Sequence, residues 1–159
     1  MTTATQNLEN DHVQILRLIE VMERITQSDN PNVEHMETIV KVIREFADGL
    51  HHAKEEQLLF PLMVQKGFSY ETGPIAVMLH DHVEGRNFVK GMAEKISLYK
   101  LGETSALKAI YSNMLGYADL LKNHRKGGLV QIDHVHGDLR LIAFLDIEAH
   151  GLAGLEAAG

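Results

Sequence analysis

The sequence contains no cysteine. This absence excludes disulfide bonds, thiolate metal sites, iron–sulfur clusters held by cysteine and cysteine nucleophiles. Any metal ion must therefore be bound by nitrogen and oxygen atoms. A basic surface is also missing, because 15 lysines and arginines stand against 22 acids, for a formal net charge of −7. That balance argues against a nucleic-acid partner or an anionic membrane surface.

Several other features are absent. Residues 1–10 lack the basic and apolar regions of a signal peptide, and no apolar run approaches membrane-spanning length. We therefore expect a cytoplasmic protein with no membrane partner. There is no glycine-rich phosphate loop and no serine–histidine–acid pattern, so we name no catalytic residue. The 159 residues fit one domain, 1–159, as a monomer or homodimer.

Ten histidines are spread along the chain, and the most distinctive polar run is HHAKEEQLLFP at 51–61. Within it, His51 with Glu55 and His52 with Glu56 are one helical turn apart, where two side chains can bind one ion. Helical spacing places the first pair on an apolar stripe and the second on a mostly polar one. We expect His51 and Glu55 to face inward, with His52 and Glu56 beside or behind them. The apolar stripe comprises Met36, Val40, Ile43, Ala47, His51, Glu55, Leu58 and Leu62.

Four amphipathic segments are separated by short loops, which predicts an all-α fold, an up-down-up-down four-helix bundle. Glycines 127 and 128 are expected to weaken or end the fourth helix, because each costs on the order of 1 kcal/mol relative to alanine. A short fifth C-terminal helix is predicted from about Val135 to Ala149. The four segments run over about 5–27, 32–65, 74–99 and 105–125.

Each segment carries one histidine where its apolar stripe would otherwise have a hydrophobic residue. In such a bundle, the start of one helix lies level with the end of the next. The early-late-early-late order of these histidines brings them toward one end, although His51 fits only if Pro61 shortens the regular helix. Buried polar groups rarely lack partners, so we predict a shared metal site, against the alternative of four core histidines satisfied separately. The candidate ligands are His12, His51, Glu55, His82 and His124.

At this point the residues resemble the hemerythrin-like family, the HHE cation-binding domains. HHAKEEQLLFP at 51–61 and GPIAVMLHDHVEGR at 73–86 look like that family's second and third helices. Asp11-His12 and 117–124 match its first and fourth helices, so the resemblance covers about residues 8–124. It implies the same five ligands and a non-haem di-iron pair as cofactor. Ligand identity alone also suits zinc or manganese.

The resemblance ends after His124, and segment 127–159 diverges. The family's fourth helix normally offers a second carboxylate one turn after its histidine, and here that position is Gly128. Asp133 is nine residues from His124, about 13 Å along an unbroken helix. It could serve only if the two glycines folded the chain back. The departure implies a weakened or partly occupied second metal position.

Three functions remain open from the sequence. The first is an iron protein that binds or senses dioxygen, nitric oxide or iron itself, with a metal ion and a small diatomic ligand as partners. The second is an iron-dependent enzyme that processes peroxide or nitric oxide, where Tyr117 could donate a hydrogen bond or an electron, although buried tyrosine is more often packing. The third is a metal-free helical interaction module.

Overall fold

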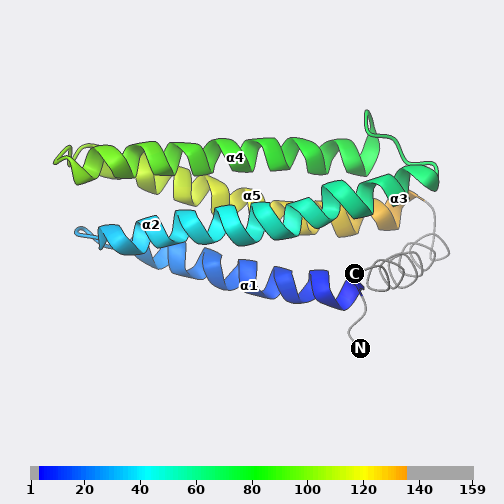
Figure 1. Ribbon diagram of the computed structural model, residues 1–159, viewed down its shortest axis with the longest axis horizontal. Helices are drawn as coiled ribbons and strands as arrows, with labels where there is room; N and C mark the ends of the chain where they lie inside the picture. The colour runs from blue at the N-terminus through cyan, green and yellow to red at the C-terminus, as the bar shows by residue number, and fades with distance from the viewer. Residues whose placement is uncertain (1–3, 136–159) are drawn as a thin grey trace, which may run out of the picture.

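The computed structural model describes residues 4–135, with side chains over 10–124. Over this part of the chain every regular element is a helix, and four long helices lie side by side (Figure 1). This confirms the all-α prediction and is consistent with a helical bundle. The predicted fifth helix lies almost entirely outside the described residues. The helices are α1 (Ala4–Ile25), α2 (Val33–Val42), η1 (Ile43–His52), η2 (Glu55–Leu59), α3 (Phe60–Gln65), α4 (Gly73–Lys100) and α5 (Ala106–Val135).

The four elements from α2 to α3 form one uninterrupted helix over residues 33–65, here called the central helix. Its start is capped by Asn32, whose side-chain oxygen accepts hydrogen bonds from the backbone N–H groups of Glu34 and His35, at 2.8 and 3.3 Å. α4 begins with proline in its first turn, where a missing N–H costs nothing. Short turns of the chain connect the helices, so that α4 packs along α5 and the central helix contacts α1 and α4 (Figure 1).

Buried apolar side chains form two clusters along the bundle. The larger cluster joins α1, the first part of the central helix, α4 and α5. The smaller cluster joins the end of the central helix to the start of α4. Between Ala47 and Leu59 the buried positions are polar instead, and between Met78 and Val89 they are His82 and Gly85. The buried polar residues are Asp11, His51, His52, Glu55 and His82.

The stripe predicted for the second segment holds only in part. Ala47, His51 and Glu55 are buried, but Leu58 and Leu62 are only partly buried, and Leu59 and Met63 take their places. The burial interval is thus four residues over the whole stretch 47–63. An α-helix repeats its face every 3.6 residues, whereas the i→i+5 bonds of π-helix make a wider turn. The π-helical segments η1 and η2 therefore keep residues four apart on the same face.

Pro61 explains part of this change in pitch. Proline has no N–H, so it cannot donate the α-helical bond to the carbonyl four residues earlier. One residue before it, the Phe60 N–H donates to the Glu55 carbonyl, an i→i+5 bond. The helix then continues through Pro61 to Gln65. The proline shifts the hydrogen bonding rather than ending the helix.

Glycines 127 and 128 were expected to weaken or end the fourth helix, and the second of these alternatives is wrong, since α5 runs on to Val135. Adding a residue to an existing helix is far easier than starting one, so two internal glycines can be carried along. None of the helices in the described part of the chain is long and apolar enough to cross a membrane.

Candidate metal centre

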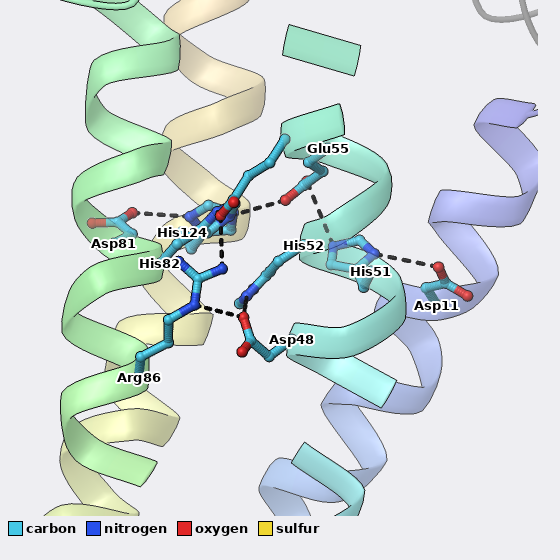
Figure 2. Close-up of polar contacts among 10 residues, drawn as sticks. Asp11, Asp48, His51, His52, Glu55, Asp81, His82, Arg86 and His124 are labelled. Carbon is cyan, nitrogen blue, oxygen red and sulfur yellow. Dashed lines mark hydrogen bonds and ion pairs between the residues drawn. The ribbon is translucent and has the colours of Figure 1, made fainter. Parts of the chain in front are cut away.

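The five predicted ligands come from all four long helices and are brought into one layer. Figure 2 labels four of them, His51, Glu55, His82 and His124. The side chains form two groups, and within each group all the ligand atoms lie within 4.8 Å of one another. The first group is His12, His51 and Glu55, and the second is His52, Glu55 and His82. Glu55 belongs to both groups, because its Oε1 lies 3.5 Å from His51 Nε2 and its Oε2 lies 3.0 Å from His82 Nε2. One carboxylate therefore stands between two positions at which an ion could be held.

Two of these atoms lack a hydrogen bond within the described residues. Glu55 Oε2 and His82 Nε2 are both buried and lie 3.0 Å apart, yet they are not aligned as donor and acceptor. Buried polar atoms in proteins nearly always have a partner. A nitrogen and an oxygen directed at one shared space are what two ligands of a single cation require. With no cysteine in the chain, the donor set is nitrogen and oxygen, so the residues present fit a metal ion such as iron, manganese or zinc.

In four histidines the ring's Nδ1 faces a carboxylate oxygen. In each of them Nε2 is therefore the ring nitrogen that could bind a metal ion. A metal-binding histidine usually donates its second N–H in this way, which fixes the tautomer and the ring orientation. Three pairs are labelled in Figure 2: His51 with Asp11 at 3.3 Å, His52 with Asp48 at 3.4 Å and His124 with Asp81 at 2.9 Å. The fourth pair is His82 with Glu56 at 2.8 Å.

Three of these carboxylates, Asp11, Asp48 and Asp81, were not predicted. Asp11 and Asp81 each precede a histidine of the layer, His12 and His82, but each contacts a histidine on a neighbouring helix. The repeated Asp-His dipeptide was the available signal. It occurs early in α1 and early in α4, so that one residue faces the layer and the one before it reaches sideways.

The expectation that His52 lies on the polar side of its helix is wrong. His52 is only 4% exposed, and its ring stacks on that of His82 with centroids 3.9 Å apart and planes 16° apart. The π-helical segment η1 ends at His52, and its wider turn brings both His51 and His52 inward. Glu56 lies behind them as expected, against His82 Nδ1.

His12 and His124 lie at opposite sides of the layer. The His12 ring centroid is 4.8 Å from that of His51, within the first group. The His124 ring centroid is 5.4 Å from that of His82 and 6.4 Å from that of His52. His124 thus lies beside the second group without being among its close ligand atoms. His80, in contrast, is exposed and pairs with Glu84 at 3.5 Å.

The layer carries excess negative charge. Five carboxylates contact its histidines, and two cationic side chains, Lys54 and Arg86, contact those carboxylates. With neutral histidines, three negative charges remain uncompensated. A cluster of this charge can be balanced by protonated imidazoles or by bound cations.

Burial and neighbouring groups set the charge of the two most enclosed ligands. Burial, with the nearby His82, lowers the pKa of His52 to about 4. Burial acts to raise the pKa of Glu55, but contact with His82 and the charges of His51 and His124 lower that pKa to about 2. At neutral pH, His52 is then a neutral imidazole and Glu55 a carboxylate, which are the forms that bind metal.

The fourth helix supplies no carboxylate one turn after its histidine. Gly128 occupies that position within α5, and the helix continues unbroken. Asp133 lies nine residues beyond His124 on this helix, about 13 Å along its axis. The chain does not fold back at the glycines, so the route by which Asp133 could have served is closed.

Four side-by-side helices with a buried layer of histidines and carboxylates define a cation-binding helical protein. The Hemerythrin HHE cation binding domain model matches residues 3–127. The chain therefore belongs to the hemerythrin HHE cation-binding domain family. No curated protein and no solved structure matches the chain.

Proposed function

We propose that this protein holds a pair of non-haem iron ions that share Glu55, and that it binds or senses dioxygen, nitric oxide or iron at this centre. The supporting observation is the pair of ligand groups that meet at Glu55, with Glu55 Oε2 and His82 Nε2 buried and lacking hydrogen-bond partners within the described residues. Membership of a cation-binding family supports a metal in this layer. We also propose that the four long helices alternate in direction, which makes the fold an up-down-up-down four-helix bundle.

The ligands divide between the two ions. His12 and His51 would hold one ion and His52 and His82 the other, with Glu55 between them. His124 lies nearest to the second group. The absence of a carboxylate at position 128 leaves one position with fewer ligands than the family pattern provides. We therefore propose unequal occupancy of the two positions.

Iron, when bound, supplies an open coordination position and a change of oxidation state. The chain supplies the enclosure, since His51 and His82 are each 1% exposed and Glu55 is 5% exposed. The smaller apolar cluster lies next to the layer and includes Phe60, whose ring stacks near that of His82 with centroids 5.9 Å apart. Such an enclosed apolar and histidine-lined environment suits a small uncharged molecule, which is why a diatomic gas is the proposed ligand.

Reconstitution of metal-free protein with ferrous iron under anaerobic conditions, followed by air, tests this function. We expect about two irons per chain at most and an oxygen-dependent absorption band that disappears when oxygen is removed. Steady consumption of added peroxide would instead support an iron-dependent enzyme. No iron retained after desalting would contradict the proposal.

Thermal unfolding supplies a second measurement. A ligand that binds only the folded state stabilises it, by about 2.7 kcal/mol at a free concentration of 100 times Kd. We expect the unfolding midpoint to rise with ferrous iron and to fall when a chelator is added. A midpoint that neither iron nor chelator changes would favour the metal-free interaction module.

A further inference from the structure

Arg86 joins the two carboxylates that support the second ligand group. It lies on α4, one turn after His82, and its guanidinium reaches across to the central helix (Figure 2). Its Nε donates to Asp48 Oδ1 at 2.8 Å, and its Nη2 donates to Glu56 Oε1 at 2.8 Å. Asp48 and Glu56 are two helical turns apart, so one planar side chain spans the distance between them.

The same two oxygen atoms also face histidines. Asp48 Oδ1 lies 3.4 Å from His52 Nδ1, and Glu56 Oε1 lies 2.8 Å from His82 Nδ1. His52 and His82 are the two stacked histidines of the second ligand group. A single guanidinium therefore fixes both acceptors that orient these two rings.

In the first ligand group, a lysine and not an arginine contacts the supporting carboxylate. The carboxylate that faces His51 Nδ1 is Asp11, and Lys54 Nζ lies 2.9 Å from the same Asp11 oxygen. Lysine is a flexible point charge, whereas arginine presents a rigid planar set of donors that can hold two oxygens at once. The two halves of the centre are thus supported by different devices.

We propose that Arg86 is a positioning residue for the His52–Glu55–His82 half of the centre, and that Lys54 has the corresponding role for the half that contains His51. The metal-binding part of this inference rests on the proposed function. Arg86 acts through Asp48 and Glu56, which lock the tautomer and orientation of His52 and His82. The side chain of Arg86 is 42% exposed, and those of Asp48 and Glu56 are 34% and 28% exposed. Since exposed ion pairs add little stability, we assign orientation as the main role of this contact.

Four variants separate the two halves. Arg86→Gln removes the charge and the rigid fork, and Arg86→Lys keeps a charge but cannot hold both oxygens in the same way. Lys54→Gln tests the other half. Lys90→Gln is the matched control, because Lys90 lies one turn after Arg86 on α4, is exposed and pairs only weakly with Glu94 at 3.9 Å. Circular dichroism and thermal midpoints verify that each variant folds.

The first measurement uses metal-free protein, so it does not depend on the proposed function. Proton–nitrogen NMR correlation of the imidazoles reports the tautomer of each histidine. In the wild type we expect the Nδ1–H tautomer for His52 and a proton on Nδ1 of His82, held toward Asp48 and Glu56 respectively. In Arg86→Gln we expect both rings to show a redistribution of protons between Nδ1 and Nε2. Arg86→Lys should show a smaller change, while Lys90→Gln should match the wild type. Unchanged tautomers in Arg86→Gln would overturn the role of Arg86.

The second measurement is an anaerobic calorimetric titration of the metal-free variants with ferrous iron. Changing a residue that supports a ligand typically costs 10–100-fold in metal affinity. We expect Arg86→Gln to weaken one of two binding phases on the order of tenfold and to leave the other within about twofold. Lys54→Gln should show the opposite selectivity. Equal weakening of both phases by either variant would overturn the division into halves. If the wild type binds no iron, the proposed function fails, and the tautomer measurement still decides the role of Arg86.

Discussion

His52 and His82 stack across two helices, with ring centroids 3.9 Å apart and 16° between their planes. Two imidazolium ions at this distance would repel each other, so at least one ring is neutral. Burial keeps the pKa of His52 near 4, which makes His52 the neutral ring at pH 7. The stack therefore places a neutral nitrogen ligand next to Glu55 before any ion arrives.

The first prediction concerns Glu55, which belongs to both ligand groups. Glu55→Gln keeps the size of the side chain and removes its charge. Because this residue stands between the two positions, we expect both binding phases for ferrous iron to weaken by more than the 10–100-fold typical of supporting residues. Iron content after reconstitution and desalting should fall to less than half of the wild-type value.

Glu45→Gln is the control for this prediction. Glu45 lies on the same helix, is exposed and pairs with Lys41 at 3.9 Å, so iron content should stay at the wild-type level. If Glu55→Gln lost only one of the two phases, Glu55 would belong to a single position. The bridging arrangement would then be wrong.

The central helix shows which buried positions helical periodicity can predict and which it cannot. A helical repeat correctly placed His51 and Glu55 in the core, because its successive steps of four residues from Ala47 match the observed burial interval. It failed for His52 and for Leu58, because η1 and η2 are π-helical. Whether the backbone hydrogen bonds have α-helical or π-helical spacing depends on tertiary packing and on the missing N–H of Pro61. A rule that assumes α-helix throughout cannot register such a change.

The supporting carboxylates were harder to predict from the sequence. Asp48 is one turn before His52 and could have been proposed from spacing alone. Asp11 and Asp81 act on other helices, so their partners depend on how neighbouring helices are rotated. The sequence specifies each helix's apolar face, but the relative rotation of two helices follows from side-chain packing between them. The burial of His51 and His82 was therefore predictable, whereas the burial of His52 and the histidines' partners across helices were not.

The second prediction concerns the buried hydroxyl of Tyr117. Within the described residues this hydroxyl has no hydrogen-bond partner, and the side chain is 1% exposed. A buried polar group without a partner costs about 1–3 kcal/mol. Tyr117→Phe should therefore leave the free energy of unfolding unchanged or raise it, measured by chemical denaturation of metal-free protein.

Tyr111→Phe gives the matched comparison. The Tyr111 hydroxyl donates to the backbone carbonyl of Ser28 at 2.5 Å and ties α5 to the connection after α1. Its loss should lower the free energy of unfolding by about 0.5–1.5 kcal/mol. Equal losses in the two variants would show that the Tyr117 hydroxyl also has a partner.

The third prediction concerns the close approach of α4 and α5. A Cβ added at Gly116 would lie 2.5 Å from Phe88 Cε1 and 2.8 Å from Phe88 Cζ. Overpacking of this kind typically costs about 1–3 kcal/mol, against about 1 kcal/mol gained by replacing glycine in a helix. We expect Gly116→Ala to lower the free energy of unfolding by about 1 kcal/mol.

Gly91→Ala should be tolerated better than Gly116→Ala. Its Cβ would lie 2.5 Å from Asn113 Oδ1, the end of a side chain that can rotate away. The aromatic ring at Gly116 has no comparable freedom, since Phe88 packs against the larger apolar cluster. Denaturation curves that ranked the two variants in the reverse order would contradict this account of the helix contact.

The last prediction restores a carboxylate to the fourth helix. Position 128 is one turn after His124 in an uninterrupted α5, so a side chain there shares a face with the histidine. Gly128→Glu should strengthen the weaker iron-binding phase and raise iron content toward two per chain. Gly127→Glu is its control, because it gains the same helix propensity but lies about 100° around the helix axis. If both variants raised iron content equally, the gain would come from the stiffened helix, and the missing carboxylate would not be what limits the second position.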